Sequence, residues 1–278
     1  REQTLLTAKN PMTTAQDTLW ERFIQPIFGF LIDREALKEL SDSIDWAEAG
    51  DRLKDPELLY PEYYTSQNFH GIAGGYLTSG AAVTYDPVTK HALPPNENWN
   101  REAVVKAITG NPQKILDLGC GTGSTTIMLK QAFSSAEVVG LDLSPQMLTM
   151  SEYKAQEAEL DIKWVHGLAE ATNFADAEFD VVTASLLFHE TPSAVAQQVL
   201  QEAYRLLKPG GQIVILDGHQ KTLRNTTWLP NIFEEPYIKE YAAGSIDAWM
   251  GKAGFNQVLT EDVWWTNQLT TGLKSSSN

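Results

Sequence analysis

Three glycines directly follow an apolar segment in the middle of the chain. Lys114 to Leu118 has the composition of a buried strand, and Gly119, Gly121 and Gly123 come after it. Glycine lets a backbone adopt positive φ and approach a ligand without a side chain in the way. A turn of this kind at the carboxyl end of a strand is where open α/β sheets bind nucleotide-like cofactors. The same spacing fits an ordinary tight strand-to-helix turn, so the glycines alone leave both interpretations open.

A carboxylate on the next apolar segment favours the cofactor-binding interpretation. Val138 to Leu143 is predicted to be a second strand, and its Asp142 lies 19 positions after Gly123, where a carboxylate accepts both hydroxyls of a ribose. A solvent-exposed Asp at the end of a strand is the alternative. Together the two features suit a dinucleotide or S-adenosylmethionine. The dinucleotide fingerprint requires a third glycine at position 124, where this chain has Ser124, so a ligand without a diphosphate fits better.

The elements that position these residues alternate along the chain. From about Asn111 onward, short apolar segments alternate with longer amphipathic ones, which predicts strand-helix-strand units and a parallel sheet. Helices are expected to begin at Ser144-Pro145 and Thr191-Pro192, each with a side-chain oxygen as cap and proline at the first helical position. The second helix is expected to end at Pro209-Gly210-Gly211. The predicted strands are Lys114 to Leu118, Glu137 to Leu141, Asp161 to Val165, Phe179 to Ala184 and Gln212 to Asp217, with a closing pair at Phe255 to Thr260 and Val263 to Thr270.

The two ends of the chain differ from this alternating region. We interpret the aromatic-rich segment Arg224 to Gly244 as an insertion that covers a pocket, followed by a helix near Ile246 to Ala253. Helical patterns cover Thr14 to Leu40 and Ile44 to Lys54, whereas the Gly- and aromatic-rich stretch from Tyr60 to Asp86 fits neither a helix nor a strand. The expected organisation is an N-terminal helical lid region over residues 1–100, a cofactor-binding domain over 101–272 and a disordered tail over 273–278.

Charge and composition exclude several classes of partner. The chain has 21 Lys and Arg against 36 Asp and Glu, a net charge of −15, without a dense basic cluster. Such a surface repels a phosphate backbone, so nucleic acid is not an expected partner. Cys120 is the only cysteine, which excludes an internal disulfide or a thiolate metal cluster, and no metal ligands are expected. No apolar run has the length of a membrane span, and the cytoplasm or an equivalent reducing compartment is expected.

Four motifs follow one another along the chain: Ile115-Leu-Asp-Leu-Gly-Cys-Gly-Thr-Gly123, Gly140-Leu-Asp-Leu-Ser-Pro-Gln-Met147, Phe179-Asp-Val-Val182 and Leu207-Lys-Pro-Gly-Gly211. In type and order they resemble the motifs of class I S-adenosylmethionine-dependent methyltransferases, and most of all the small-molecule subgroup of ubiquinone/menaquinone-biosynthesis C-methyltransferases. The resemblance covers roughly residues 100 to 270. It implies a Rossmann-like α/β fold, with a seven-stranded sheet whose last strand is antiparallel, and an N-terminal, mostly helical accessory region.

The resemblance also implies which residues contact the cofactor. Asp117 and the backbone of Gly119 would meet the methionine amino end, Asp142 the ribose, and Leu143 and Met147 would flank the adenine. Family members often have Gly-Asp-Ala-Glu after the third strand, whereas this chain has Gly167-Leu-Ala-Glu170, so the adenine contact is expected from backbone or from Glu170. The expected cofactor residues are Asp117, Gly119, Gly121, Gly123, Asp142, Leu143, Met147, Leu168, Ala169, Glu170 and Ser185.

The residues after the fourth strand would border the transferred methyl group, because the fourth strand neighbours the first. Ser185 belongs to this stretch, as does His189, which is a candidate base because imidazole titrates near neutrality. His189 could equally orient the loop. His70 and Tyr85 are the second-choice catalytic contacts. An apolar acceptor pocket is expected to be completed by Trp228, Phe233 and Tyr237.

We therefore expect methyl transfer from S-adenosylmethionine to carbon or oxygen of a small, largely apolar acceptor, with S-adenosylhomocysteine as product. The expected partner is that small molecule, with no nucleic acid and no integral membrane segment. Two alternatives stay open: an NAD-dependent oxidoreductase on a similar sheet, and a cofactor-binding module that lacks catalysis and acts through a partner.

Overall fold

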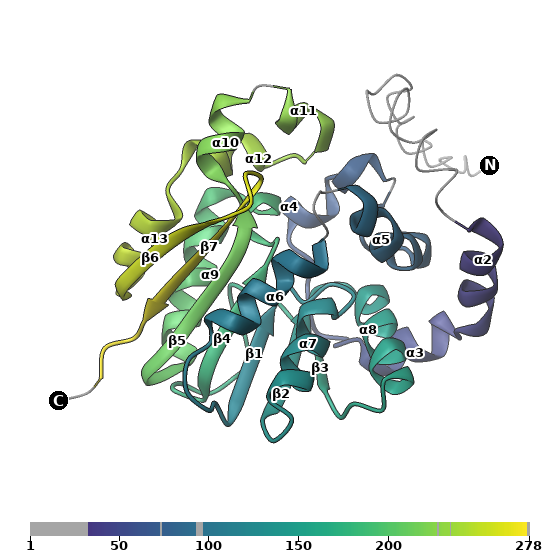
Figure 1. Ribbon diagram of the computed structural model, residues 1–278. Helices are drawn as coiled ribbons and strands as arrows, with labels where there is room; N and C mark the ends of the chain where they lie inside the picture. The colour runs from purple at the N-terminus through teal and green to yellow at the C-terminus, as the bar shows by residue number, and fades with distance from the viewer. Residues whose placement is uncertain (1–32, 73, 93–96, 227, 234, 277–278) are drawn as a thin grey trace, which may run out of the picture.

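The fold is built on one mixed sheet. The computed structural model describes residues 33–72, 74–92, 97–226, 228–233 and 235–276. Within them, seven strands lie in the order β3-β2-β1-β4-β5-β7-β6, and β7 runs antiparallel to β5 and β6 (Figure 1). This confirms the predicted seven-stranded sheet with an antiparallel last strand. The strands are β1 (Lys114–Leu118), β2 (Glu137–Asp142), β3 (Lys163–His166), β4 (Phe179–Ser185), β5 (Leu207–Gly218), β6 (Asn256–Val263) and β7 (Asn267–Leu273).

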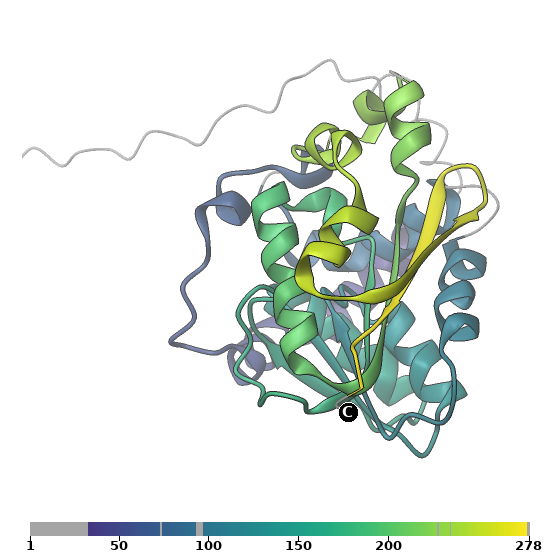
Figure 2. The same cartoon turned by 90° about the vertical axis from the view of Figure 1, so that its left-hand side faces the viewer.

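The central strand β1 is apolar along its length because helices cover both faces of the sheet. Ile115 packs with Val104 of α6 (Glu97–Ala107) and Leu129 of α7 (Ser124–Ala132). Its neighbour Leu116 faces the other side, in the core that includes α9 (Ser193–Leu206). Figure 2 shows α9 on one side of the sheet, and α6 and α7 on the other. A parallel strand buried on both faces has no polar alternation, which is why the sequence predicts it well.

The two predicted proline-marked helix starts have different outcomes. α8 (Pro145–Glu157) begins as predicted, and the Ser144 hydroxyl accepts a hydrogen bond from the Met147 N–H at 3.1 Å. The second prediction is wrong, because Pro192 is the cap of α9 and the Thr191 hydroxyl instead donates to the Phe188 carbonyl. Thr191 ends the preceding 3₁₀ turn, η3 (Phe188–Glu190), so its side chain is used there.

The end of α9 also differs from the prediction. The helix stops at Leu206, before the Pro-Gly-Gly sequence, and Leu207 is already extended at the start of β5. A residue that precedes proline disfavours the helical region, so Lys208 cannot carry the helix on to Pro209. The Pro-Gly-Gly sequence therefore belongs to the beginning of β5, next to an irregularity in its pairing with β4.

Two segments without a clear sequence period are partly helical. Tyr60 to Asp86, predicted to be neither helix nor strand, contains α4 (Glu62–Thr65), the 3₁₀ turn η2 (Phe69–Gly71) and the start of α5 (Ser79–Ala92). The segment Arg224 to Gly244 spans the end of α10 (Gln220–Asn225) and contains α11 (Leu229–Phe233) and α12 (Ile238–Ala243). Most of these helices have only one or two turns, which is too short for an amphipathic period to show.

The remaining helices pack around the elements that cover the sheet or on the sheet itself. α2 (Arg34–Ser43) lies at the end of the predicted helix over Thr14 to Leu40, of which residues 14–32 lie outside the described part of the chain. α3 (Trp46–Leu53) matches the second predicted helical pattern, and α13 (Ile246–Ala253) lies where the sequence predicts a helix. None of the described helices has the length and apolar content needed to cross a bilayer. In Figure 1, α4, α5 and α10 to α12 gather beyond the carboxyl ends of the parallel strands, where a ligand site is expected.

Candidate cofactor and acceptor site

The glycine turn and Asp142 meet where β1 and β2 end. The two strands are parallel, with Leu118 beside Leu141, so the turn after β1 lies next to the end of β2. The Gly121 N–H donates to Asp142 Oδ2 at 2.8 Å, and the Ser144 N–H donates to Oδ1 at 2.8 Å. Two backbone groups therefore fix the orientation of this carboxylate.

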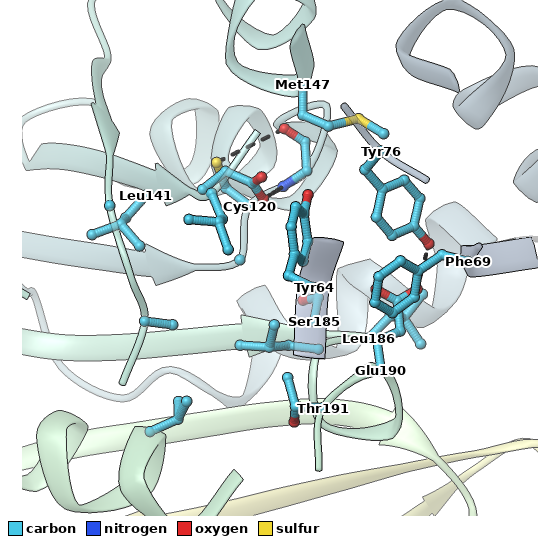
Figure 3. Close-up of a pocket in the computed structure, with 18 of the residues that line it drawn as sticks. Tyr64, Phe69, Tyr76, Cys120, Leu141, Met147, Ser185, Leu186, Glu190 and Thr191 are labelled. Carbon is cyan, nitrogen blue, oxygen red and sulfur yellow. Dashed lines mark hydrogen bonds between the residues drawn. The ribbon is translucent and has the colours of Figure 1, made fainter. Parts of the chain in front are cut away.

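A hollow opens beside this contact. Counted with the solvent at its mouth, it encloses about 820 Å³. Figure 3 shows Tyr64 projecting into the space between Met147 at one end and Thr191 at the other. Five aromatic side chains from the N-terminal segment line it: Tyr63, Tyr64, Phe69, Tyr76 and Tyr85. The N-terminal segment thus supplies much of the apolar wall opposite the sheet.

Gly121 is the glycine of the turn that leaves room for a ligand. Its φ is +55°, and no atom of the described residues beyond its chain neighbours lies within 4 Å of the place where a Cβ would stand. A Cβ on Gly119 would meet Leu187, and one on Gly123 would meet the Trp164 ring. Packing therefore requires glycine at positions 119 and 123. At Gly121 the absence of a side chain leaves an open space in the turn, which we call the cradle.

Among the residues that the structure describes, the hollow has a net negative lining. Asp142, Glu170 and Glu190 line it together with one guanidinium, that of Arg101. Arg101 is buried and ion-paired with Glu97, and its Nε donates to Glu97 Oε1 at 2.9 Å. Three carboxylates against one paired cation disfavour a diphosphate and suit a ligand that carries positive charge. The lining therefore fits S-adenosylmethionine, whose sulfonium is cationic.

Two titratable groups of the lining are perturbed by burial. Burial raises the pKa of Asp142 to about 6, although the N–H groups of Ser144 and Gly121 act in the opposite direction. Asp142 is thus ionised at neutral pH and becomes protonated in mild acid. Cys120 also lines the hollow, and burial raises the pKa of its thiol well above the ordinary value. The thiol therefore stays protonated at neutral pH.

Most of the predicted cofactor residues line the hollow. They are Gly119, Gly121, Asp142, Leu143, Met147, Ala169, Glu170 and Ser185. Asp117, Gly123 and Leu168 are not part of the lining. Asp117 is buried beneath the turn, where its carboxylate accepts hydrogen bonds from Thr126 Oγ1 at 2.6 Å and Thr183 Oγ1 at 2.7 Å. This carboxylate ties β1 to α7 and β4, and its contact with the methionine amino end stays a prediction.

Of the three predicted catalytic residues, Tyr85 alone lines the hollow. Burial raises the pKa of its phenol well above the ordinary value, so it is a weak candidate for a base. His189 Nδ1 lies 2.6 Å from Asp217 Oδ1. Burial alone would lower the pKa of His189, but the Asp217 carboxylate outweighs it and raises the pKa to about 9. A histidine that already holds its proton at neutral pH is not ready to accept another.

The other predicted contacts lie at or beyond the edge of the hollow. His70 Nδ1 lies 2.6 Å from Glu235 Oε1. Trp228 is 52% exposed, the Tyr237 hydroxyl donates to the Tyr63 carbonyl at 3.0 Å, and neither residue is among those that line the hollow. The side chain of Phe233 lies outside the described part of the structure.

An ionic contact joins the N-terminal segment to the glycine turn. Asp86 of α5 accepts hydrogen bonds from Thr122 and from Lys154 of α8. Lys154 Nζ also donates to Ser124 Oγ at 2.9 Å. α5, which carries Tyr85, is therefore attached to the two elements that flank the cradle.

The sequence predictions did not single out Arg101, Asp217 or Glu235. Asp217 carries the same signal as Asp142, an acidic residue at the end of an apolar strand, and it holds His189. Arg101 follows Glu97 by four positions, a spacing that predicts an ion pair on a helix but does not reveal which way the pair faces. Glu235 lies in a short connection before α12 and carries no sequence signal.

A family comparison agrees with the geometry of the sheet and the hollow. Residues 115–211 match the family model described as a methyltransferase domain. By this match residues 115–211 are similar to a methyltransferase domain, and the strand order and the glycine turn beside Asp142 agree with the class I methyltransferase fold that the sequence motifs imply. The cofactor of class I methyltransferases is S-adenosylmethionine, and the negative charge of the residues that line the hollow suits its sulfonium.

The particular relatives match about half of the chain. It is 40% identical over 119 residues to the demethylmenaquinone methyltransferase of Thermus thermophilus, covering 43% of this chain and 53% of that protein. It is 36% identical over 148 residues to the Deinococcus radiodurans protein of the same name, covering 53% of this chain and 61% of that protein. The alignments thus span between half and two thirds of these relatives.

Solved structures support the same fold. An S-adenosylmethionine-dependent methyltransferase from Aquifex aeolicus superposes with a TM-score of 0.54 at 17% identity, covering 70% of this chain and 98% of that one. Together, the comparisons favour the methyltransferase interpretation over an NAD-dependent oxidoreductase.

Proposed function

We propose that this chain transfers a methyl group from S-adenosylmethionine to carbon or oxygen of a small, largely apolar acceptor. The supporting observation is that one hollow has the Gly121–Asp142 contact on one side and aromatic side chains on the other. When bound, S-adenosylmethionine supplies an electrophilic methyl group on its sulfonium. The residues of the chain then have to orient the acceptor and exclude water.

The cofactor roles follow from position in the hollow. Asp142 accepts the ribose hydroxyls, and the Gly121 cradle admits the adenosine. Leu143 and Met147 flank the adenine. Its amino group is bonded by Glu170 or by backbone beside Ala169. At the methionine end, the Gly119 backbone contacts the amino acid portion and the Arg101 guanidinium pairs with its carboxylate.

The acceptor is placed at the end of the hollow that lies away from Met147 and the adenine. Ser185 and Leu186 lie there with Glu190, and Phe69 and Tyr76 close the side (Figure 3). Their large apolar area suits a flat, apolar molecule, while the Tyr76 hydroxyl and the Glu190 carboxylate offer polar contacts for its oxygens. The relatives named demethylmenaquinone methyltransferase make a reduced naphthoquinone the first acceptor to test. In this scheme the residues before α6 act as the lid, and the sheet with its covering helices acts as the cofactor domain. The boundaries expected after residues 100 and 272 fall inside α6 and β7, so the lid would end before α6 and a tail could begin only after β7.

The reaction is tested with an acceptor panel. The protein is incubated with S-adenosylmethionine carrying a deuterated methyl group and with reduced naphthoquinones, reduced benzoquinones or phenols, and the products are analysed by mass spectrometry. We expect one acceptor class to gain the labelled methyl group in step with the formation of S-adenosylhomocysteine. Calorimetry with S-adenosylhomocysteine and with NAD runs alongside.

Three results would contradict the proposal in different ways. Tight binding of NAD without binding of S-adenosylhomocysteine would identify an oxidoreductase. Binding of S-adenosylhomocysteine without methylation of any acceptor would favour a module that acts through a partner. Methylation of protein or nucleic acid in preference to every small molecule would overturn the acceptor class.

The affinity for cofactor is expected to fall in mild acid. Ribose hydroxyls donate to the ionised Asp142, and the pKa of this carboxyl is raised to about 6, so acid removes the charge that they bind. The dissociation constant for S-adenosylhomocysteine is expected to be constant above about pH 7 and to rise by up to ~10-fold per pH unit below about pH 6. Calorimetric titrations across this range measure the change. The variant Asp142→Asn cannot titrate and is expected to bind weakly with little dependence on pH; a wild-type profile as flat as that of the variant would refute the role of Asp142.

A further inference from the structure

Three potential metal ligands converge at the acceptor end of the hollow. His70 comes from η2, Glu190 from the end of η3 and Glu235 from the connection before α12. One ligand atom of each lies within 4.8 Å of the others. His70 Nε2 is 3.6 Å from Glu190 Oε1, and His70 Nδ1 is 2.6 Å from Glu235 Oε1. One imidazole thus stands between two carboxylates that are far apart in the sequence.

Glu235 is a buried carboxylate whose charge a bound cation would compensate. Its side chain is 1% exposed, its Oε1 lies 2.6 Å from His70 Nδ1, and within the described residues its Oε2 accepts no hydrogen bond. In the same part of the chain, the ion pairs of Glu190 and Glu235 are made with histidine and not with Lys or Arg. A buried carboxylate costs several kcal/mol unless a cation or hydrogen-bond donors compensate it. Glu190 and Glu235 share the His70 imidazole, and Glu190 Oε1 also lies 3.9 Å from His189 Nε2, so among the described residues imidazoles alone balance the two carboxylates. A divalent cation bound between them would compensate both carboxylates directly.

The cluster reaches the hollow through Glu190. This residue lines the hollow, and the Tyr76 hydroxyl, which also lines it, donates to Glu190 Oε1 (Figure 3). The Tyr76 ring lies edge-on to the His70 ring, with 6.0 Å between centroids. An ion held by the three ligands would therefore lie behind Glu190 and next to the space for the acceptor.

The geometry points to a divalent transition-metal site formed by His70, Glu190 and Glu235. One imidazole nitrogen and two carboxylate oxygens suit Mn²⁺ or Zn²⁺ better than Ca²⁺ or Mg²⁺, which prefer oxygen ligands alone. The coordination positions that these residues leave open are available to water or to an oxygen of the acceptor. This site goes beyond the proposed methyl transfer, because the ligands bind a metal whether or not the cofactor is present.

The site is tested by metal binding in the absence of cofactor and acceptor. Chelator-treated protein is titrated with Mn²⁺ and followed by electron paramagnetic resonance, and with Zn²⁺ by calorimetry. We expect one ion per chain. Glu235→Gln and His70→Asn are each expected to weaken binding by at least ~10-fold. Asn is chosen at position 70 because His70 has φ +51°, which Asn tolerates better than most residues.

Glu240→Gln is the matched control, because it removes one carboxylate of α12 that is not part of the cluster, and the Gln amide oxygen can still accept the hydrogen bond that the Ser193 N–H donates to Glu240 Oε1 at 2.8 Å. Its affinity for metal is expected to equal that of the wild type. Binding of S-adenosylhomocysteine and thermal unfolding are measured for every variant, so that a misfolded variant is recognised. If one of the two metal-ligand variants misfolds, the metal affinity of the other one tests the site. The inference is overturned if the wild type binds neither ion saturably, or if Glu235→Gln and His70→Asn bind like the control. Neither result bears on methyl transfer, which the acceptor panel tests separately.

Discussion

Gly121→Val is expected to weaken the binding of S-adenosylhomocysteine by at least ~100-fold, or ~2.7 kcal/mol, while the sheet stays folded. The φ of +55° at Gly121 belongs to the left-handed region, which costs a residue with a Cβ about 1–2 kcal/mol and a β-branched residue more. The valine side chain would also occupy the space in which we place the adenosine. Isothermal titration calorimetry measures the affinity, and circular dichroism melting reports on the fold.

Gly110→Val is the control for backbone strain. Gly110 has φ +76°, lies in the exposed turn before β1, and a Cβ there would meet nothing within 4 Å among the described residues. Its substitution imposes a comparable left-handed strain away from the hollow, so it is expected to lower the melting temperature and leave the affinity unchanged. If Gly121→Val binds as tightly as Gly110→Val, the cradle does not hold the cofactor.

Asp142→Ala is expected to weaken cofactor binding by at least ~10-fold, because a hydrogen bond to a charged group contributes ~1.5–3 kcal/mol. The variant loses the hydrogen bonds that the two ribose hydroxyls donate to this carboxylate. It also loses the hydrogen bond from the Gly121 N–H, which is 2.8 Å long in the wild type, so the glycine turn is held less firmly. Calorimetry with S-adenosylhomocysteine at a pH of about 8, well above the pKa of about 6, measures the full effect.

Asp180→Ala is the matched control for Asp142→Ala. Asp180 lies in β4 and also accepts two backbone N–H groups, from Gln113 at 2.9 Å and Lys114 at 2.8 Å, but at the amino end of β1. Both variants remove a carboxylate that links neighbouring strands, and only one of them faces the hollow. Equal affinities in the two variants would mean that the ribose is held elsewhere.

The sequence predicts the sheet well because local signals are sufficient there. Strands such as β1 are continuous apolar segments buried on both faces, and the Ser144 cap needs only its own neighbours along the chain. Predictions fail where a short element depends on a distant contact. The one-turn helix α4 has no period to detect, and the hydroxyl of Thr191 is directed by the turn before it.

The candidate site divides in the same way. Asp142 and Gly121 lie on neighbouring strand ends, so their proximity follows from the order of the strands. The environment of His189 depends on Asp217, which the sequence places at the end of another strand without revealing its partner. The approach of His70 to Glu235 depends on two short connections whose paths no local pattern encodes.

The Asp86 contact has a consequence for how this domain could be transplanted into another protein. A graft limited to residues 115–211, the segment that matches the family model, would leave Thr122 and Lys154 without their shared acceptor and would omit the aromatic wall from Tyr63 to Tyr85. The smallest portable unit therefore has to include α4 and α5 as well as the strands. Exchanging acceptor specificity between homologues would accordingly require swapping the stretch before α6 together with the sheet that it covers.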